Sequence, residues 1–288
     1  MALEDAAPQV LVQDIGEVEL PYLQYDGTDK PIVLLHATGF LPWLWHPIAR
    51  DLAKAHRVIA PYFCDHRLNE PEKGGLNWMI LAQDLARFCD RLGLAQPLMV
   101  GHSMGATVVT LAAGAFGLNP RGLILIEPIF LPEDFYRVQL SVEQHPLASK
   151  SIKRRNHWNN SEEALVYLKS RTLFKNWDNE MLDLYVRYGL REGPTGGLNL
   201  TCSPEREAAL FMGGMHYDPW PILPKIECPV LVVEGSESEN RHYIDLKKAS
   251  SLFPKGRYTL VQNAGHLIPM EQPQAIAALI QGFLEEAP

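Results

Sequence analysis

The chain has 288 residues, 47% of them hydrophobic, which is enough for one large domain or for a domain with an inserted subdomain. Its formal net charge of -8 argues against a nucleic-acid partner, which would need a basic face. No segment reaches the roughly 18 uninterrupted apolar residues of a membrane span, and the acidic start MALEDAAPQV is unlike a signal peptide, so we expect neither.

Short apolar runs alternate along the chain with longer stretches of helical period. The predicted strands cover residues 31–37, 57–63, 97–103, 122–128, 228–235 and 258–265, and the first helices between them cover 43–55, 77–94 and 106–118. These strands are apolar throughout rather than at every second position, which predicts a parallel sheet with helices on both faces. The preceding segments VLVQDIGEVEL and PYLQYDG predict an antiparallel hairpin at one edge of that sheet.

A long helical insertion is expected between the strands at 122–128 and 228–235. Its helical pieces cover 161–171, 177–190 and 203–214, with no convincing strand among them. The last piece has a start signal, because Ser203 can act as its N-cap and Pro204 fits the first helical position. We therefore predict a core of residues 1–131 and 223–288, covered by a helical lid of residues 132–222.

Four basic residues gather in the predicted lid, at Lys150, Lys153, Arg154 and Arg155. Such a cluster can attract an acidic substrate. A run of charges is more commonly a solvated helix face, and we take that as the expectation here.

The four cysteines, Cys64, Cys89, Cys202 and Cys228, are far apart and show neither a CxxC pair nor metal-ligand spacing. Cys89 falls in the apolar-periodic stretch LAQDLARFCDRLGL, which favours a buried free thiol. Together with the missing targeting segments, this composition predicts a soluble protein of the reducing cytoplasm that needs no metal and no cofactor. The sequence leaves a homodimer open.

The segment LMVGHSMGA places a single serine between two glycines at the end of a predicted strand. Gly101-His102-Ser103-Met104-Gly105 fits G-x-S-x-G, and a predicted helix follows it. This strand–turn–helix context is what a nucleophile elbow requires, because a serine hydroxyl is a poor nucleophile unless it stands exposed beside a base. The alternative is a glycine-rich turn with an incidental serine.

Two further segments favour the nucleophile. LLHATGF (34–40) ends a strand where a loop is needed to stabilise the oxyanion of acyl transfer. We expect one N–H donor from Met104, directly after the nucleophile, and the other from Thr38 or Ala37. NAGHLIPMEQP (263–273) places His266 after the last strand, where a general base is expected.

With these motifs in place, the chain resembles the α/β-hydrolase fold enzymes over essentially its whole length. The resemblance is carried by PIVLLHATGF, GHSMGA and the late glycine–histidine pair, in that order. It implies a mostly parallel eight-stranded sheet, a triad of serine, histidine and acid, and a cap inserted after the sixth strand. The closest likeness is to bacterial lid-bearing hydrolases, with HATGF in place of the commoner HGxP loop.

The acid of the implied triad has two candidates. The family usually places aspartate three residues after the glycine that ends the seventh strand, which is Gly235, and Ser238 stands there instead. Some relatives place the acid one step later, which selects Glu239. Glu127, at the end of the sixth strand, resembles the acid of pancreatic-type lipases and zearalenone-type lactonases. We favour Glu127, because a strand tip fixes a carboxylate better than a glutamate-rich loop does, and keep Glu239 as the alternative.

The predicted function is that of a serine hydrolase that cleaves a carboxylic ester or lactone of a small, largely apolar substrate through an acyl-enzyme. The same triad also supports C–C bond or amide hydrolysis, perhydrolysis or a lyase reaction, and a receptor-like binding module with a retained triad is the alternative of another class. The side chains expected to line the substrate pocket are those of His36, Phe40, Trp43, His102 and Ile129.

Overall fold

The computed structural model describes residues 7–63 and 66–286. Residues 1–6, where no signal peptide is expected, and Cys64 lie outside the described part. Within residues 7–63 and 66–286, no helix combines the length and the apolar content that crossing a bilayer would need.

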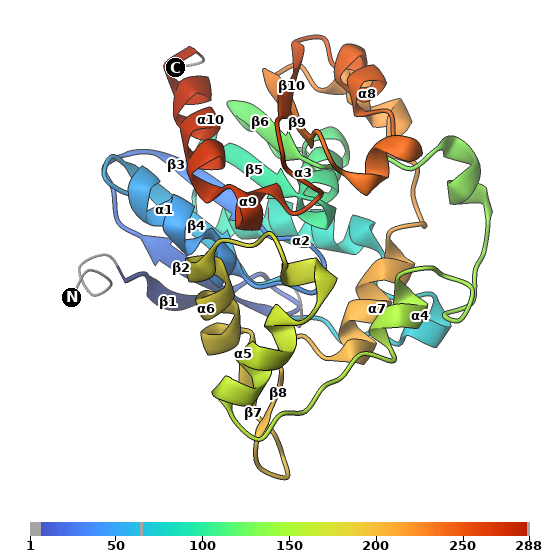
Figure 1. The fold of residues 1–288 in the computed structure, drawn as a ribbon. Coiled ribbons are helices and arrows are strands. Elements are labelled where there is room, and N and C mark those ends of the chain that lie inside the picture. Colours follow the sequence, from blue (N-terminus) through green and yellow to red (C-terminus); the bar gives the residue numbers. More distant parts are fainter. Residues whose placement is uncertain (1–6, 64–65, 287–288) are drawn as a thin grey trace.

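One eight-stranded sheet forms the centre of the molecule, with the strand order β1-β2-β4-β3-β5-β6-β9-β10 (Figure 1). β1 and β2 form an antiparallel hairpin at one edge, β2 pairs antiparallel with β4, and the remaining neighbours are parallel. This confirms the predicted sheet and its edge hairpin. The strands are β1 (Gln9–Asp14), β2 (Glu19–Tyr25), β3 (Asp29–Leu35), β4 (His56–Pro61), β5 (Leu98–His102), β6 (Gly122–Ile126), β9 (Val230–Gly235) and β10 (Gly256–Val261).

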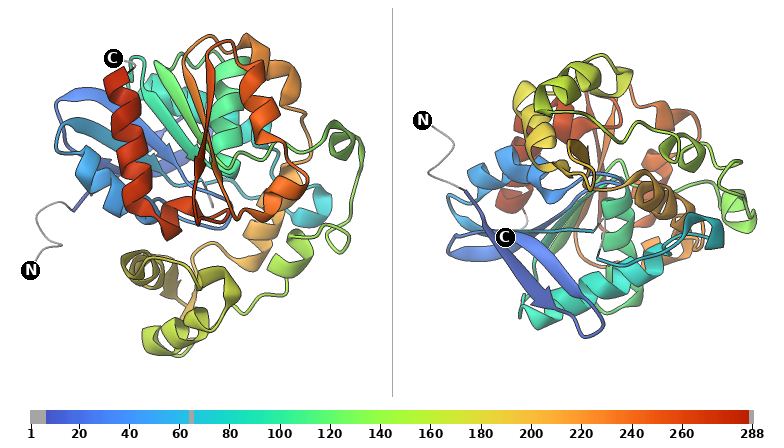
Figure 2. Two further views of the ribbon diagram at one scale, coloured as in Figure 1. Left: turned by 45° about the horizontal axis from the view of Figure 1, so that its top comes forward. Right: turned by 90° about the horizontal axis from the view of Figure 1, so that it is seen from below.

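Helices cover both faces of the sheet, as Figure 2 also shows. α1 (His46–Leu52) and α10 (Pro273–Glu286) pack on one face, and α2 (Trp78–Arg91), α3 (Met104–Ala115) and α8 (Leu246–Leu252) pack on the other. Successive strand side chains point to opposite faces of the sheet. In β3, Ile32 packs in the core under α1 and α10, and Val33 packs in the core under α2, α3 and α8. Both are fully buried, which is why the inner part of such a strand is apolar on both faces.

The predicted insertion lies between β6 and β9. Its helices are α4 (Ala148–Ser151), α5 (Ser161–Lys169), α6 (Asn179–Tyr188) and α7 (Pro204–Gly213). The start signal of α7 is confirmed, because the Ser203 side chain accepts a hydrogen bond from the Arg206 N–H at 3.3 Å. The expectation of a strandless insertion was wrong: β7 (Leu190–Glu192) and β8 (Leu198–Leu200) form an antiparallel hairpin. Each of its strands has three residues, too few to show a period of two.

The insertion and the core share one apolar cluster. Phe40, from the loop after β3, packs against Trp177 and Tyr185 of the insertion, with ring centroids 5.5 and 6.0 Å apart. Trp43 stacks flat on Tyr188 at 3.6 Å. These contacts seat the insertion on the loops that follow the carboxyl ends of the strands, where ligands bind in open α/β sheets.

Short helical turns complete the chain. α9 (Ile268–Glu271) follows the last strand, and its Met270 carbonyl accepts a hydrogen bond from the Asp178 N–H of the insertion at 2.8 Å. The 3₁₀ turns are η1 (Pro42–Trp45), η2 (Pro71–Lys73), η3 (Glu133–Arg137), η4 (Thr172–Phe174), η5 (Trp220–Lys225) and η6 (Glu239–His242).

Candidate active site

Ser103 occupies a sharp turn between β5 and α3. Its backbone has φ 55° and ψ −118°, a conformation that a non-glycine residue adopts only under strain. The turn needs both flanking glycines. A Cβ on Gly101 would lie 2.5 Å from the Ala106 backbone, and one on Gly105 would lie 2.5 Å from the Leu35 carbonyl oxygen. The glycines therefore allow α3 to pack closely against β5 and the end of β3 while the serine stands at the strand tip.

Strand register brings Ser103 and Glu127 to the same edge of the sheet. In the parallel pair β5–β6, the last residues His102 and Ile126 lie opposite each other. Ser103 and Glu127 directly follow them, so both begin at the same level of the sheet. The Ser103 N–H donates to the Ile126 carbonyl at 2.9 Å, and the Glu127 N–H donates to the Val233 carbonyl at 2.8 Å. Both residues are thus fixed by backbone hydrogen bonds.

His266 connects the serine to the acid. Its Nε2 lies 3.0 Å from Ser103 Oγ, and its Nδ1 lies 3.0 Å from Glu127 Oε2. The side chain of Glu127 is fully buried, whereas that of His266 is 27% exposed. The structure therefore brings together the three residues singled out as nucleophile, base and preferred acid.

Three groups hold the buried Glu127 carboxylate. Besides His266, the Gly235 N–H donates to Oε1 at 2.7 Å and the Ser238 hydroxyl donates to Oε2 at 2.7 Å. A buried carboxylate requires such donors, because hydrogen bonds to its charged form offset the loss of water. Glu239 is exposed on η6, and the carboxylate in contact with His266 is that of Glu127.

The two sources expected for the oxyanion donors lie beside the serine. Met104 begins α3, and the first N–H groups of a helix have no partner within the helix. Ala37 and Thr38 are buried in the turn after β3. His36 holds this turn in place, since its Nδ1 lies 2.8 Å from the Ala37 carbonyl and its Nε2 accepts the Phe63 N–H at 2.9 Å.

Comparison with known proteins identifies the family of this chain. The family model described as "Alpha/beta hydrolase family" matches residues 32–279. This chain belongs to the alpha/beta hydrolase family. It is similar to the esterase YbfF of Escherichia coli K12, with 24% identity over 91% of this chain and 96% of the esterase. It is also similar to the (E)-2-((N-methylformamido)methylene)succinate hydrolase of Acinetobacter baylyi, with 20% identity over 91% of this chain and 93% of that enzyme.

Solved structures share the fold of this hydrolase. The crystal structure of E-2-(acetamidomethylene)succinate hydrolase superposes with a TM-score of 0.81 at 20% identity, covering 96% of this chain and 99% of that one. A thermophilic esterase from Thermogutta terrifontis superposes with a TM-score of 0.70 at 23% identity, covering 97% of this chain and 99% of that one.

Three of the expected pocket residues of this hydrolase meet at one small cavity. His36, Phe40 and His102 line a space of about 10 Å³, together with residues of η1 and α9. A space of this size holds about one water molecule, so these side chains do not by themselves enclose a substrate. The other two expected pocket residues do not line this cavity: Trp43 stacks on Tyr188, and the N–H of the half-buried Ile129 donates to Thr107 Oγ1 at 2.9 Å.

His102 supports the loop that carries the base. Its Nε2 lies 2.9 Å from the His266 carbonyl oxygen, and the two rings are 5.3 Å apart. Burial lowers the pKa of His102 to about 3, so that at neutral pH the ring is uncharged and Nε2–H donates to that carbonyl. In this alpha/beta hydrolase, the residue before Ser103 therefore holds the backbone of His266, the predicted base.

Of the four basic residues of the insertion, Lys150, Lys153 and Arg155 are exposed, as expected of a solvated face, and Arg154 is the exception. Arg154 Nη1 contacts both oxygens of the Glu207 carboxylate, at 3.0 and 2.8 Å, and Nη2 lies 3.3 Å from the Tyr185 hydroxyl. Glu207 also packs closely against the loop after β3, since a Cβ added to Gly39 of that loop would lie 2.2 Å from Glu207 Oε1. The pair thus packs against the turn that holds Thr38 and Ala37.

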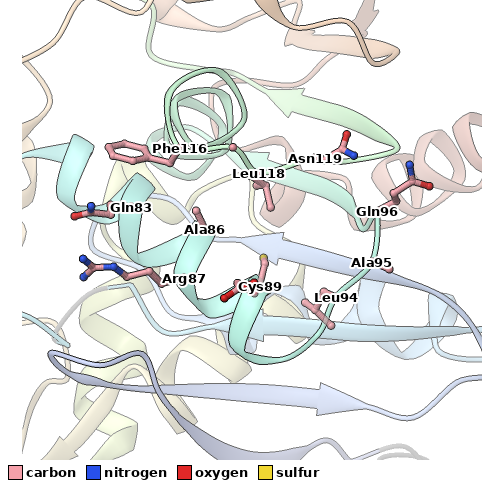
Figure 3. A pocket seen from close by; sticks show the side chains of 12 residues that line it. Gln83, Ala86, Arg87, Cys89, Leu94, Ala95, Gln96, Phe116, Leu118 and Asn119 are labelled. Atoms are coloured by element: carbon pink, nitrogen blue, oxygen red, sulfur yellow. The ribbon is translucent and has the colours of Figure 1, made fainter.

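A larger hollow of the hydrolase lies far from the serine. It measures about 640 Å³ and is lined by residues of α2 and of the turn after α3, at the opposite end of α3 from Ser103 (Figure 3). Cys89 is part of its lining and is a buried free thiol, as expected. Burial raises the pKa of this thiol to about 12, so it stays protonated and unreactive near neutral pH. None of the residues expected at the active site lines this hollow.

Proposed function

We propose that this alpha/beta hydrolase is a serine hydrolase that cleaves a carboxylic ester or lactone of a small, largely apolar substrate. The observation that supports it is the chain of contacts from Ser103 Oγ to His266 Nε2 and from His266 Nδ1 to Glu127 Oε2, each 3.0 Å long. A serine on a strained turn, joined to a base that is itself oriented by a buried acid, fits the arrangement of an activated nucleophile.

The first half of the reaction forms an acyl-enzyme. His266 Nε2 takes the proton of Ser103 as Oγ attacks the carbonyl carbon, and Glu127 stabilises the resulting imidazolium through Nδ1–H. The tetrahedral oxyanion receives N–H donors from Met104 and from Thr38 or Ala37. His266 then gives its proton to the leaving oxygen, which departs as an alcohol.

The second half repeats these steps with water. His266 takes a proton from a water molecule that attacks the acyl carbon, and the carboxylic acid leaves when Ser103 regains its proton. Every group in these steps belongs to one chain, so the proposal requires neither a cofactor, a metal nor a partner protein. A homodimer is compatible with it.

The surroundings of the site support an apolar substrate. Phe40 of the turn after β3, Trp177 and Tyr185 of the insertion, and Met270 of α9 belong to one apolar cluster beside the site. Amide hydrolysis is the second candidate. It is favoured by the names of two relatives, the hydrolases of (E)-2-((N-methylformamido)methylene)succinate and of E-2-(acetamidomethylene)succinate, which contain an amide group.

A substrate panel tests the proposal. It contains p-nitrophenyl esters of increasing acyl length, lactones of increasing ring size and N-acyl amides with and without a carboxylate, with mass detection of the peptide that carries Ser103. We expect rapid multiple turnover of at least one ester or lactone and a transient acyl adduct on that peptide. Turnover confined to amides would favour the second candidate. A single slow acylation without turnover would instead favour the receptor-like module.

Gly39→Ala tests the part that the turn after β3 has in oxyanion binding. Gly39 has φ +77°, and an added Cβ would meet Glu207 Oε1 at 2.2 Å. Because Arg154 holds Glu207 from the other side, we expect the turn to shift instead. A displacement of this kind lowers kcat/KM by about 10- to 100-fold, measured with the best p-nitrophenyl ester and by the rate of fluorophosphonate labelling.

Gly117→Ala is the matched control for backbone strain. Gly117 has a similar φ of +72° but no atom within 4 Å of an added Cβ. This variant should lose stability, by roughly 1 kcal/mol in thermal unfolding, and keep the parent's kcat/KM. Parental kcat/KM in a folded Gly39→Ala protein would contradict this part of the proposal.

We also propose the reducing cytoplasm as the working compartment. Among the cysteines that the structure describes, Cys89, Cys202 and Cys228 are free. Free thiols in place of disulfides are typical of reducing compartments.

The lid boundaries 132–222 are likewise our proposal. The apolar cluster shared by the insertion and the core supports a lid that covers the candidate site.

A further inference from the structure

Two side chains face Nδ1 of His266. Glu127 Oε2 lies 3.0 Å from this nitrogen, and Asn240 Nδ2 lies 2.9 Å from it. Asn240 belongs to η6, which follows β9, and its Oδ1 accepts a hydrogen bond from the Tyr243 hydroxyl. The loop after β9 therefore still reaches the histidine, although the acid comes from the end of β6.

The two contacts make opposite demands on one atom. A neutral imidazole carries one proton, and a ring nitrogen is either a donor or an acceptor. The carboxylate of Glu127 can only accept, so it requires Nδ1–H, whereas an amide N–H directed at Nδ1 requires a bare nitrogen. With Nδ1 bare, the proton lies on Nε2, and His266 has no lone pair with which to take the proton of Ser103.

Rotation of the Asn240 amide removes this conflict. A half-turn of the amide exchanges its oxygen and nitrogen, which places Oδ1 at Nδ1–H and Nδ2–H₂ at the Tyr243 hydroxyl, which can accept. We infer that Asn240 is a positioning residue for His266, whose amide oxygen shares the Nδ1 proton with Glu127 and stabilises the imidazolium. This inference rests on the proposed function, because it takes His266 as the base.

Other groups also act on the charge of His266. Glu127 lies within hydrogen-bond distance, the His102 ring lies 5.3 Å away and is uncharged at neutral pH, and Glu271 of α9 accepts the Gly265 N–H at 2.7 Å. Glu239 begins η6 and precedes Asn240, and Tyr243 directly follows η6 and donates its hydroxyl to Asn240 Oδ1. A variant at position 240 leaves Glu127, His102 and Glu271 in place and changes the two contacts of Asn240 itself, with Nδ1 of His266 and with the Tyr243 hydroxyl.

The pH profile of kcat/KM tests the inference. The profile is measured with p-nitrophenyl acetate and by fluorophosphonate labelling of Ser103, and its acidic limb reports the ionisation of the base in the free enzyme. Asn240→Asp adds a negative charge beside the imidazolium, so we expect this limb to move to higher pH by about one unit. Asn240→Leu removes the acceptor, and we expect the limb to move to lower pH and kcat/KM to fall by about fivefold.

Asn119→Asp is the control for added charge, because Asn119 is exposed at the far end of α3. It should leave the limb in place. The inference would be overturned if the acidic limb of the kcat/KM profile of Asn240→Asp coincides with that of the parent. It would also be overturned if this limb moves no further than that of Asn119→Asp. An unlabelled Ser103 in the parent protein would overturn the proposed function and this inference together, so the two failures are distinct.

Rescue gives a second readout. In a Glu127→Gln background, Asn240→Asp places a carboxylate where the amide now lies 2.9 Å from Nδ1. We expect the double variant to label and turn over at least tenfold faster than Glu127→Gln alone. A double variant no faster than the single one would show that position 240 does not act on His266.

Discussion

Alanine in place of Ser103 is expected to abolish ester hydrolysis. The serine supplies the only oxygen within hydrogen-bond distance of His266 Nε2 among the contacts of the described residues, at 3.0 Å, so its loss removes the acyl-enzyme route. Loss of a triad nucleophile lowers kcat by several powers of ten, with a remainder from the oxyanion donors and substrate binding. We expect kcat/KM to fall by at least about 10⁴-fold.

The variant should keep its fold. Alanine has the same Cβ as serine, so it adds no clash at the strained φ of 55°. A fluorophosphonate should add to the peptide that contains Ser103 in the parent and to none in the variant. Ser170→Ala, on an exposed turn of the insertion, should label and turn over like the parent. Residual activity within tenfold of the parent would contradict the assignment of the nucleophile.

The sheet was largely predictable from the sequence because its strands are buried on both faces. The runs 31–37 and 122–128 contain the uninterrupted apolar stretches 32–35 and 123–126, and they coincide within two residues with β3 and β6. The hairpin β7–β8 was not predicted, because each strand has only three residues and the turn between them is glycine-rich.

The helices α8 and α10 were not among the predicted elements either. The signals of α10 are present in the sequence: Pro273 begins it, and the buried Ile276, Ile280 and Phe283 recur at helical spacing. Helical spacing alone is therefore sufficient to predict α10 from the sequence.

Some contacts of the site could be predicted from local sequence patterns, and others could not. Ser103 and His266 stand in local motifs, and Glu127 follows a strand adjacent to that of the serine, so strand order suffices to place them. Contacts between distant segments leave no local pattern. The Ser238 hydroxyl on Glu127, the Asn240 amide at His266 and the pairing of Arg154 with Glu207 each join segments that only the folded chain brings together.

Glu127→Gln is expected to lower kcat by about three to four powers of ten, because it inverts the hydrogen bonding of His266. The Gly235 N–H at 2.7 Å from Oε1 fixes the amide oxygen of the new glutamine on that side. Its NH₂ group then faces Nδ1 from the position of Oε2, 3.0 Å away. An N–H donor there favours the tautomer with the proton on Nε2, which cannot accept the proton of Ser103.

Glu239→Gln is the matched control, since it makes the same chemical change on an exposed residue of η6. It should cost less than about twofold in kcat, because an exposed carboxylate without a contact to the base contributes little. Both variants should unfold cooperatively in a thermal melt, which separates loss of chemistry from loss of fold. A large loss in Glu239→Gln beside a near-parental Glu127→Gln would transfer the acid to the loop after β9. In that case the buried Glu127, which receives the Gly235 N–H and the Ser238 hydroxyl, would serve to fix that loop.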